Sequence, residues 1–243
     1  MGVFRFKHFS VVNERSAMKV NTDGVLLGVC MTLSGTEKHL LDIGTGTGTI
    51  ALIAAQRLAS YSVPGRLIQA IDIDGDSAEE AAANFSASPW ADSLSASHCS
   101  IADFKPEVKY DLIFSNPPYF DDSLQAPQQK RNNARHTQSG LSYRELIDFA
   151  VNYLEPCGRI AMVLPSDEQA RVLRYARGCG LHLGRIVKIR TVPRKEPSRI
   201  IIEFSRLRCE EPVENEITIQ SEGKYTQEYL SLTRDFYLFS ENL

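Results

Sequence analysis

The residues Asn116-Pro117-Pro118-Tyr119 directly follow Tyr110–Ser115, a run with the length and composition of a buried strand. Proline lacks a backbone N–H and has a fixed φ, so the carbonyls around Pro117 cannot be absorbed into a continuing sheet. Together with the side-chain oxygen of Asn116 they form a row of acceptors suited to the two hydrogens of one planar amino group. Tyr119 adds an aromatic face on which that group can stack. An Asn-Pro-Pro turn is also an ordinary way to leave a sheet, and both interpretations stand at this point.

A second stretch, Leu40–Gly48, is typical of a strand followed by a glycine-rich turn, and Thr49–Gln56 continues it as a helix. The glycines of the turn are Gly44, Gly46 and Gly48. Glycines let the backbone approach a ligand closely, and the helix that follows presents unpaired N–H groups to it. The dinucleotide pattern G-x-G-x-x-G would require glycine at Thr49, so the spacing argues against a dinucleotide. With Asp42 just ahead of the turn, the stretch predicts a site for a nucleotide cofactor.

Carboxylates follow two further candidate strands. Asp72 ends the run Leu67–Asp72, where a carboxylate can accept both hydroxyls of a ribose. Asp103 follows a weaker strand, Leu94–Cys99, and can accept a hydrogen bond from the amino group of an adenine.

A helix is also predicted to begin near Thr22 and Asp23, ahead of the apolar run that starts at Val25. Either residue can cap this helix and leave its first N–H groups near the cofactor. Capping alone would explain both residues.

Taken together, these motifs resemble those of the class I S-adenosylmethionine-dependent methyltransferases, over about residues 18–205. The resemblance implies that Asp42–Gly48 is the cofactor loop, with Thr22 and Asn116 also at the cofactor site, and that Asp72 and Asp103 contact the ribose and the adenine. It also implies that Asn116–Tyr119 is the signature of methyltransferases that modify amino groups. The fold expected from it is Rossmann-like, a mostly parallel sheet of seven strands in the order 3-2-1-4-5-7-6 with helices on both faces.

Three further stretches, Ala17–Gly28, Ser88–Ala91 and Asp235–Phe239, make the chain similar to the bacterial tRNA1(Val) adenine-37 N6-methyltransferases. The resemblance implies direct attack by adenine N6 on the methyl group of S-adenosylmethionine, with no covalent enzyme intermediate. Asn116 and Pro117 would orient the amine, and the base, flipped out of its stack, would lie on Tyr119. The alternatives are methylation of another RNA adenine or guanine, methylation of a protein glutamine, or an inactive RNA-binding protein with this fold.

The composition predicts one α/β domain, residues 1–243, with an N-terminal extension of about residues 1–35, because the chain has 243 residues, 43% of them hydrophobic. The five cysteines form no C-x-x-C pair, so neither a zinc site nor a disulfide framework is expected. The sequence has no uncharged apolar run long enough to suggest a membrane segment. We therefore expect a cytoplasmic protein with no metal and no obligate protein partner.

The formal net charge of -3 offers no general attraction to nucleic acid, so tRNA binding requires local basic clusters. One candidate lies in the Gln- and Asn-rich stretch 120–140, and another between two strands predicted at Leu181–Arg190 and Ser198–Arg206. The candidate contacts are Lys130, Arg131, Arg135, Arg194 and Lys195. The first cluster can equally belong to a solvated loop whose charges only keep it soluble.

Overall fold

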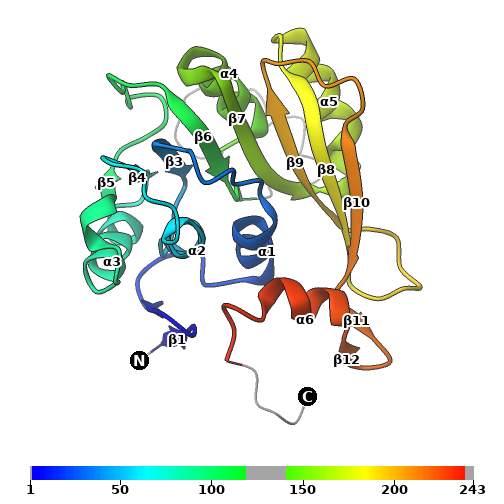
Figure 1. The fold of residues 1–243 in the computed structure, drawn as a ribbon, viewed down its shortest axis with the longest axis horizontal. Helices are drawn as coiled ribbons and strands as arrows, with labels where there is room; N and C mark the ends of the chain where they lie inside the picture. Colours follow the sequence, from blue (N-terminus) through cyan, green and yellow to red (C-terminus); the bar gives the residue numbers. More distant parts are fainter. Residues whose placement is uncertain (1, 119–140, 239–243) are drawn as a thin grey trace, which may run out of the picture.

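The computed structural model describes residues 2–118 and 141–238. Its centre is an eight-stranded sheet in the order β5-β4-β3-β6-β7-β9-β8-β10 (Figure 1). The strands are β3 (His39–Ile43), β4 (Leu67–Asp72), β5 (Leu94–His98), β6 (Tyr110–Ser115), β7 (Leu154–Pro165), β8 (His182–Arg190), β9 (Arg199–Ser205) and β10 (Val213–Thr218). All pairings are parallel except those of β9, which runs antiparallel to both β7 and β8.

The first seven of these strands reproduce the expected order 3-2-1-4-5-7-6, but the sheet has an eighth strand, so the predicted count of seven is wrong. The added strand, β10, pairs in parallel with β8 at the edge of the sheet. Its glutamates face basic residues of β8, as in the ion pair between Arg190 and Glu216 at 2.7 Å, and Ile217 is buried. A run such as Val213–Thr218 predicts a strand, but only this contact with a distant strand places it in the sheet.

Helices cover both faces of the sheet (Figure 1). One face carries α1 (Thr22–Cys30), α2 (Thr49–Leu58), α3 (Gly75–Ser86) and α6 (Gln227–Thr233), and the other α4 (Tyr143–Tyr153) and α5 (Gln169–Gly178). Two short 3-10 helices, η1 (Ala91–Ser93) and η3 (Ser166–Glu168), precede β5 and α5. Each face has its own hydrophobic core, because the side chains of the buried strands alternate between the two faces. The α/β fold class is therefore confirmed.

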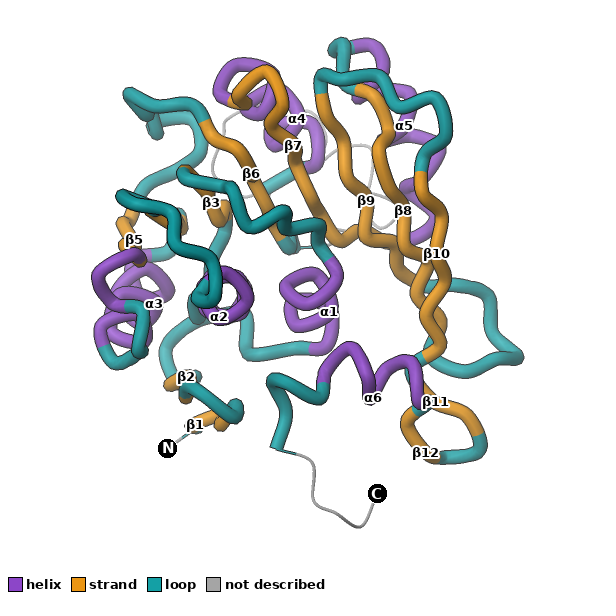
Figure 2. The backbone as a smooth tube through the Cα atoms, viewed as in Figure 1, coloured by secondary structure: helices purple, strands orange, loops and turns teal. Residues whose placement is uncertain are grey.

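The described residues near the two termini lie on the α1–α2 side of the sheet, where Phe6, Phe9 and Phe236 join its hydrophobic core (Figure 2). The N-terminal strands β1 (Val3–Arg5) and β2 (Ser10–Val12) form an antiparallel pair, and Phe6 bridges to Tyr237 near the C-terminus. A small hairpin of β11 (Gln220–Ser221) and β12 (Lys224–Tyr225) precedes α6. In the described ranges, no helix combines the length and the apolar character needed to cross a membrane.

Candidate functional site

The carboxyl ends of β3, β4 and β6 meet at one edge of the sheet. The backbone N–H groups of Gly44 and Thr45 donate to the carbonyl of Ile71, at 2.8 and 3.1 Å, which ties the glycine loop after β3 to β4. The hydroxyl of Ser115 donates to the carbonyl of Ile43 at 2.7 Å and ties β6 to β3. The fold thus brings together the glycine loop, Asp72 and Asn116, which sequence analysis placed in one site.

Gly44, Gly46 and Gly48 all have positive φ, of 71°, 56° and 80°, a region that favours glycine. A Cβ at Gly48 would lie 2.5 Å from the ring of Phe85, so the close packing of α2 on α3 requires glycine there. A Cβ at Gly46 would instead point toward the N-terminal segment, 3.4 Å from the Ser16 hydroxyl. Gly46 therefore keeps the space between the loop and that segment open.

Asp42 lies beneath the loop and is fully buried. Its Oδ2 accepts a hydrogen bond from the Thr45 hydroxyl at 2.8 Å, while Oδ1 has no hydrogen bond of normal geometry within the described chain. Burial raises the pKa of Asp42 to about 7; the Thr45 hydroxyl opposes this shift, the charge of Asp72 adds to it, and the Ala51 amide weakly opposes it. The carboxylate therefore supports the loop and is poorly compensated as an anion.

Asp72 lies at the carboxyl end of β4, next to the glycine loop. Its two oxygens accept the backbone N–H groups of Gly46, at 2.8 Å, and Asp74, at 2.9 Å. Burial raises the pKa of Asp72, and these two hydrogen bonds oppose the shift. Each oxygen keeps acceptor capacity for a further donor such as a hydroxyl. The next side chain, Ile73, is 74% exposed, so the acid stands beside an uncovered apolar surface.

Asp103 follows β5 in an exposed turn, where its Oδ2 accepts a hydrogen bond from the Ser100 hydroxyl at 2.6 Å. Within the described residues, neither Asp42 nor Asp72 nor Asp103 forms an ion pair with a lysine or arginine.

Asn116 is buried at the end of β6, with 5% of its surface exposed. Its Nδ2 donates to Oδ1 of Asn21 at 3.3 Å and approaches the sulfur of Met18 at 3.7 Å. Pro117 is also buried, and Pro118 is partly exposed. The prediction for Tyr119 falls outside the described residues.

The cap of α1 corrects one prediction. The capping residue is Asn21, whose side chain accepts the N–H of Gly24 at 2.8 Å, and neither Thr22 nor Asp23 has that role. Thr22 is exposed in the first turn, and Asp23 forms an ion pair with Arg199 at 2.9 Å. Asparagine is as good a capping residue as aspartate, so the type of residue 21 was the available signal.

The N-terminal segment, residues 13–21, contributes residues 18–21 to one wall of a small cleft, a feature that sequence analysis missed. Opposite it are the glycine loop and Asn116. The residues lining this cleft are Met18, Lys19, Val20, Asn21, Gly24, Gly44, Thr45, Gly46, Thr47, Thr49, Ile50 and Asn116. Glu80 of α3 holds the segment, because its carboxylate accepts the backbone N–H groups of residues 14, 15 and 16 at 2.7, 2.9 and 3.0 Å.

The basic residues predicted to contact RNA divide into two groups. Arg194 and Lys195 lie exposed in the loop between β8 and β9. Their neighbours are engaged, Arg190 with Glu216 and Arg199 with Asp23. The predictions for Lys130, Arg131 and Arg135 fall outside the described residues.

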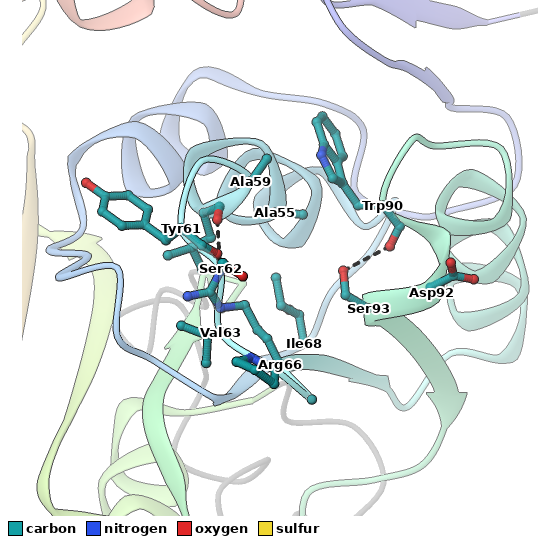
Figure 3. Close-up of a pocket in the computed structure, with 13 residues that line it drawn as sticks. Ala55, Ala59, Tyr61, Ser62, Val63, Arg66, Ile68, Trp90, Asp92 and Ser93 are labelled. Atoms are coloured by element: carbon teal, nitrogen blue, oxygen red, sulfur yellow. Dashed lines mark hydrogen bonds between the residues drawn. The ribbon is translucent and has the colours of Figure 1, made fainter.

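A larger hollow lies at the opposite end of the sheet, beside the start of β4 (Figure 3). Tyr61 and Arg66 lie on one side of it, and Trp90 and Ser93 on the other. The Arg66 guanidinium is committed to backbone carbonyls, among them those of Gly35 at 2.6 Å and Leu58 at 2.8 Å. The Arg66 guanidinium therefore holds the surrounding loops together, and none of the predicted site residues that the structure describes lines this hollow. In the described part of the chain, no cluster of three or more His, Cys, Asp or Glu side chains could hold a metal ion.

Comparison with known proteins identifies the family. Residues 16–176 match the methyltransferase small domain family. The chain is 42% identical to a tRNA1(Val) (adenine(37)-N6)-methyltransferase of Phocaeicola vulgatus, and the match covers 97% of both chains. A protein of the same name from Vibrio parahaemolyticus is 37% identical, over 97% of this chain and 95% of its own.

Solved structures show the same fold at low sequence identity. A predicted O-methyltransferase from Agrobacterium tumefaciens has a TM-score of 0.63 at 14% identity, over 91% of this chain and all of the other. A methyltransferase from Pyrococcus furiosus has a TM-score of 0.56 at 21% identity, over 81% and 89% of the two chains. These structures show the fold alone, and the family expected from the sequence motifs is confirmed by the family match and the curated relatives.

Proposed function

Because the chain belongs to the methyltransferase small domain family, we propose that it transfers a methyl group from S-adenosylmethionine to N6 of adenine-37 in tRNA1(Val). The observation that carries this proposal is the position of Asn116 and Pro117 beside the glycine loop, where β3, β4 and β6 end. A methyl donor in the loop and an amine held by these residues would then be neighbours.

The residues at this edge fit the cofactor. The glycine loop and residues 18–21 leave a cleft without large side chains on the loop side. Asp72 keeps acceptor capacity for ribose hydroxyls, the exposed Ile73 offers an apolar surface to a flat base, and Asp103 can accept from an amino group. When bound, S-adenosylmethionine supplies a methyl group on a positively charged sulfur. A negative charge on Asp72 favours that positive charge.

Asn116 and Pro117 orient the acceptor nitrogen. Adenine N6 is a poor nucleophile, because its lone pair is conjugated with the ring. Acceptance of its two hydrogens by the Asn116 side chain and the Pro117 carbonyl favours a pyramidal nitrogen with a free lone pair. Tyr119 would stack on the flipped base and offset part of the cost of removing it from the anticodon loop. Because proline restricts the backbone at this position, the protein needs little rearrangement to hold the amine in this orientation.

Arg194 and Lys195, with Lys130, Arg131 and Arg135, would contact tRNA phosphates around the base. Each phosphate contact removed should reduce the log–log salt dependence of tRNA binding by about 0.7–0.9. The substrate implies a cytoplasmic enzyme, which is the localisation we propose.

The test is methylation of an unmodified tRNA1(Val) transcript by the purified protein, followed by mass spectrometry of the nucleosides. We expect one N6-methyladenosine for each tRNA, and none in a transcript with guanosine at position 37. Methylation that persists in this second transcript would assign the enzyme to another nucleotide. No RNA methylation, together with methyl transfer to glutamine peptides, would favour the protein-modifying alternative.

A further inference from the structure

The amide of Asn116 is held from one side by the N-terminal segment. Within the described residues, its Nδ2 donates to Oδ1 of Asn21 at 3.3 Å and approaches the sulfur of Met18 at 3.7 Å. An asparagine side chain has one accepting oxygen and one donating nitrogen, and these exchange places when the amide turns over. Because the neighbours of the Asn116 nitrogen, Oδ1 of Asn21 and the Met18 sulfur, are acceptors, they favour the orientation of the amide that places its nitrogen next to them.

Asn21 is itself fixed in position. Its Oδ1 also accepts the backbone N–H of Gly24 at 2.8 Å, and its Nδ2 donates to the carbonyl of Lys19 at 3.0 Å. These two bonds determine which end of the Asn21 side chain faces Asn116. Gly24 lies beside both amides, since a Cβ there would be 3.5 Å from Oδ1 of Asn21 and 3.6 Å from Nδ2 of Asn116, which is ordinary van der Waals contact.

The segment that carries Asn21 is anchored from α3. Glu80 is 2% exposed and accepts three consecutive backbone N–H groups, which lowers its pKa although burial alone would raise it. The Asn84 side chain adds hydrogen bonds to the N–H and the carbonyl of Val12, at 2.8 and 3.0 Å, and to the carbonyl of Thr47 in the glycine loop, at 2.9 Å. The same helix thus positions both the segment and the loop.

We propose that Asn21 is a positioning residue, which holds the Asn116 amide so that its oxygen, and not its nitrogen, meets the substrate amine. This inference rests on the proposed role of Asn116. A reversed amide would place a donor against the donating amine, and the substrate would lose an acceptor. Asn21 would therefore affect turnover through Asn116, in addition to capping α1.

The test separates these two roles with four variants. Asn21→Ser keeps a capping oxygen but is one bond shorter, so it loses Asn116, which already lies at 3.3 Å. Asn21→Asp keeps both the cap and the acceptor. Asn21→Ala removes both the capping oxygen and the acceptor for Asn116. Thr226→Ala is the matched control, because Thr226 caps α6 by accepting the N–H of Tyr229 and lies away from the cleft.

At saturating S-adenosylmethionine and tRNA, Asn21→Ser should lower kcat by about 10- to 100-fold with little change in KM or melting temperature. Asn21→Asp should retain most of the wild-type kcat. Thr226→Ala should keep the wild-type kcat while its melting temperature falls by about 2–4 °C. A wild-type kcat in Asn21→Ser would overturn the inference.

Asn116→Ala and the double variant Asn21→Ser/Asn116→Ala identify which idea fails. If Asn21 acts through Asn116, the double variant should be no slower than Asn116→Ala. Losses that multiply would overturn the positioning role while leaving the role of Asn116 intact. A wild-type kcat in Asn116→Ala itself would instead remove the proposed orientation of the substrate by that residue.

Discussion

Acidic side chains at the two ends of the sheet have different hydrogen-bond and ion-pair partners. At the end where the parallel strands begin, Glu37 and Glu203 are 2% and 3% exposed, and each is paired with arginine. Arg159 bridges both glutamates, and Arg185 reaches Glu203 at 3.2 Å. Burial alone would raise the pKa of Glu37, but hydrogen bonds from the backbone and from Arg159 lower it below its ordinary value.

At the other end, where β3 and β4 finish, Asp42 and Asp72 form no ion pair with a lysine or arginine of residues 2–118 or 141–238. Burial raises the pKa of both Asp42 and Asp72, and only amides, a hydroxyl and the nearby His98 oppose this shift. Asp42 and Glu37 are both almost fully buried, yet their pKa values shift in opposite directions, because hydrogen bonds from the backbone and from Arg159 outweigh the effect of burial at Glu37, whereas the hydrogen bonds at Asp42 do not. Acids with perturbed pKa values cluster at functional sites. A ligand with a positive charge and hydroxyl groups, bound at this end of the sheet, would compensate the charge of these acids.

The largest effect should come from breaking the paired end. Arg159→Ala would leave Glu37 and Glu203 without their shared cation, and should lower the free energy of unfolding by about 3–5 kcal/mol. Urea unfolding measures it, with the exposed Arg208→Ala as the control, expected within about 0.5 kcal/mol of wild type. A loss in Arg159→Ala no larger than in this control would show that the network contributes little.

A change at the unpaired end should affect turnover instead. Asn116→Ala should lower kcat by roughly 100-fold or more and leave the affinity for S-adenosylmethionine nearly intact, because it removes an acceptor for the substrate amine. Single-turnover methylation and calorimetry separate the two quantities. Asn152→Ala, which removes an exposed asparagine of α4, should match wild type in both. A parallel loss of cofactor affinity in Asn116→Ala would move Asn116 from the substrate side to the cofactor side.

The two ends should also differ in how they respond to pH. Between about pH 4 and 7 the folded protein without ligand keeps a proton on Asp42 that the unfolded chain has lost, so stability should fall as pH rises, by up to about 1.4 kcal/mol per unit. Glu37 should have the opposite effect: its contribution to the stability of the fold should be lost as the pH falls below 4.5, the ordinary pKa of a glutamate. Urea titrations of wild type and Asp42→Asn, from pH 5 to 8, isolate the first effect as a difference. Identical pH profiles would contradict it.

The sequence predicted the parts of the site that depend on local patterns. Glycines that must adopt positive φ, a carboxylate at the end of a strand and two prolines after another strand are all readable within a few residues. Because the ends of parallel strands meet at one edge, these predictions could be combined into a single site.

What the sequence could not predict depends on distant contacts. Asn21 and Asn116 are 95 residues apart, and neither residue type indicates the other as a partner. Glu80 stands in a run of helix formers beside Glu79, where an acid usually faces solvent, yet it is buried and binds the N-terminal segment. The edge position of β10 likewise depends on its pairing with β8.

The division between the two ends is tested most directly by the affinity for S-adenosylmethionine, measured by calorimetry in wild type, Asp72→Ala and Arg159→Ala under conditions where all are folded. Wild type should bind, Asp72→Ala should bind more weakly by about 1–3 kcal/mol because ribose hydroxyls lose a charged acceptor, and Arg159→Ala should match wild type. No binding by wild type, or unchanged affinity in Asp72→Ala, would contradict the assignment of the unpaired acids to the cofactor.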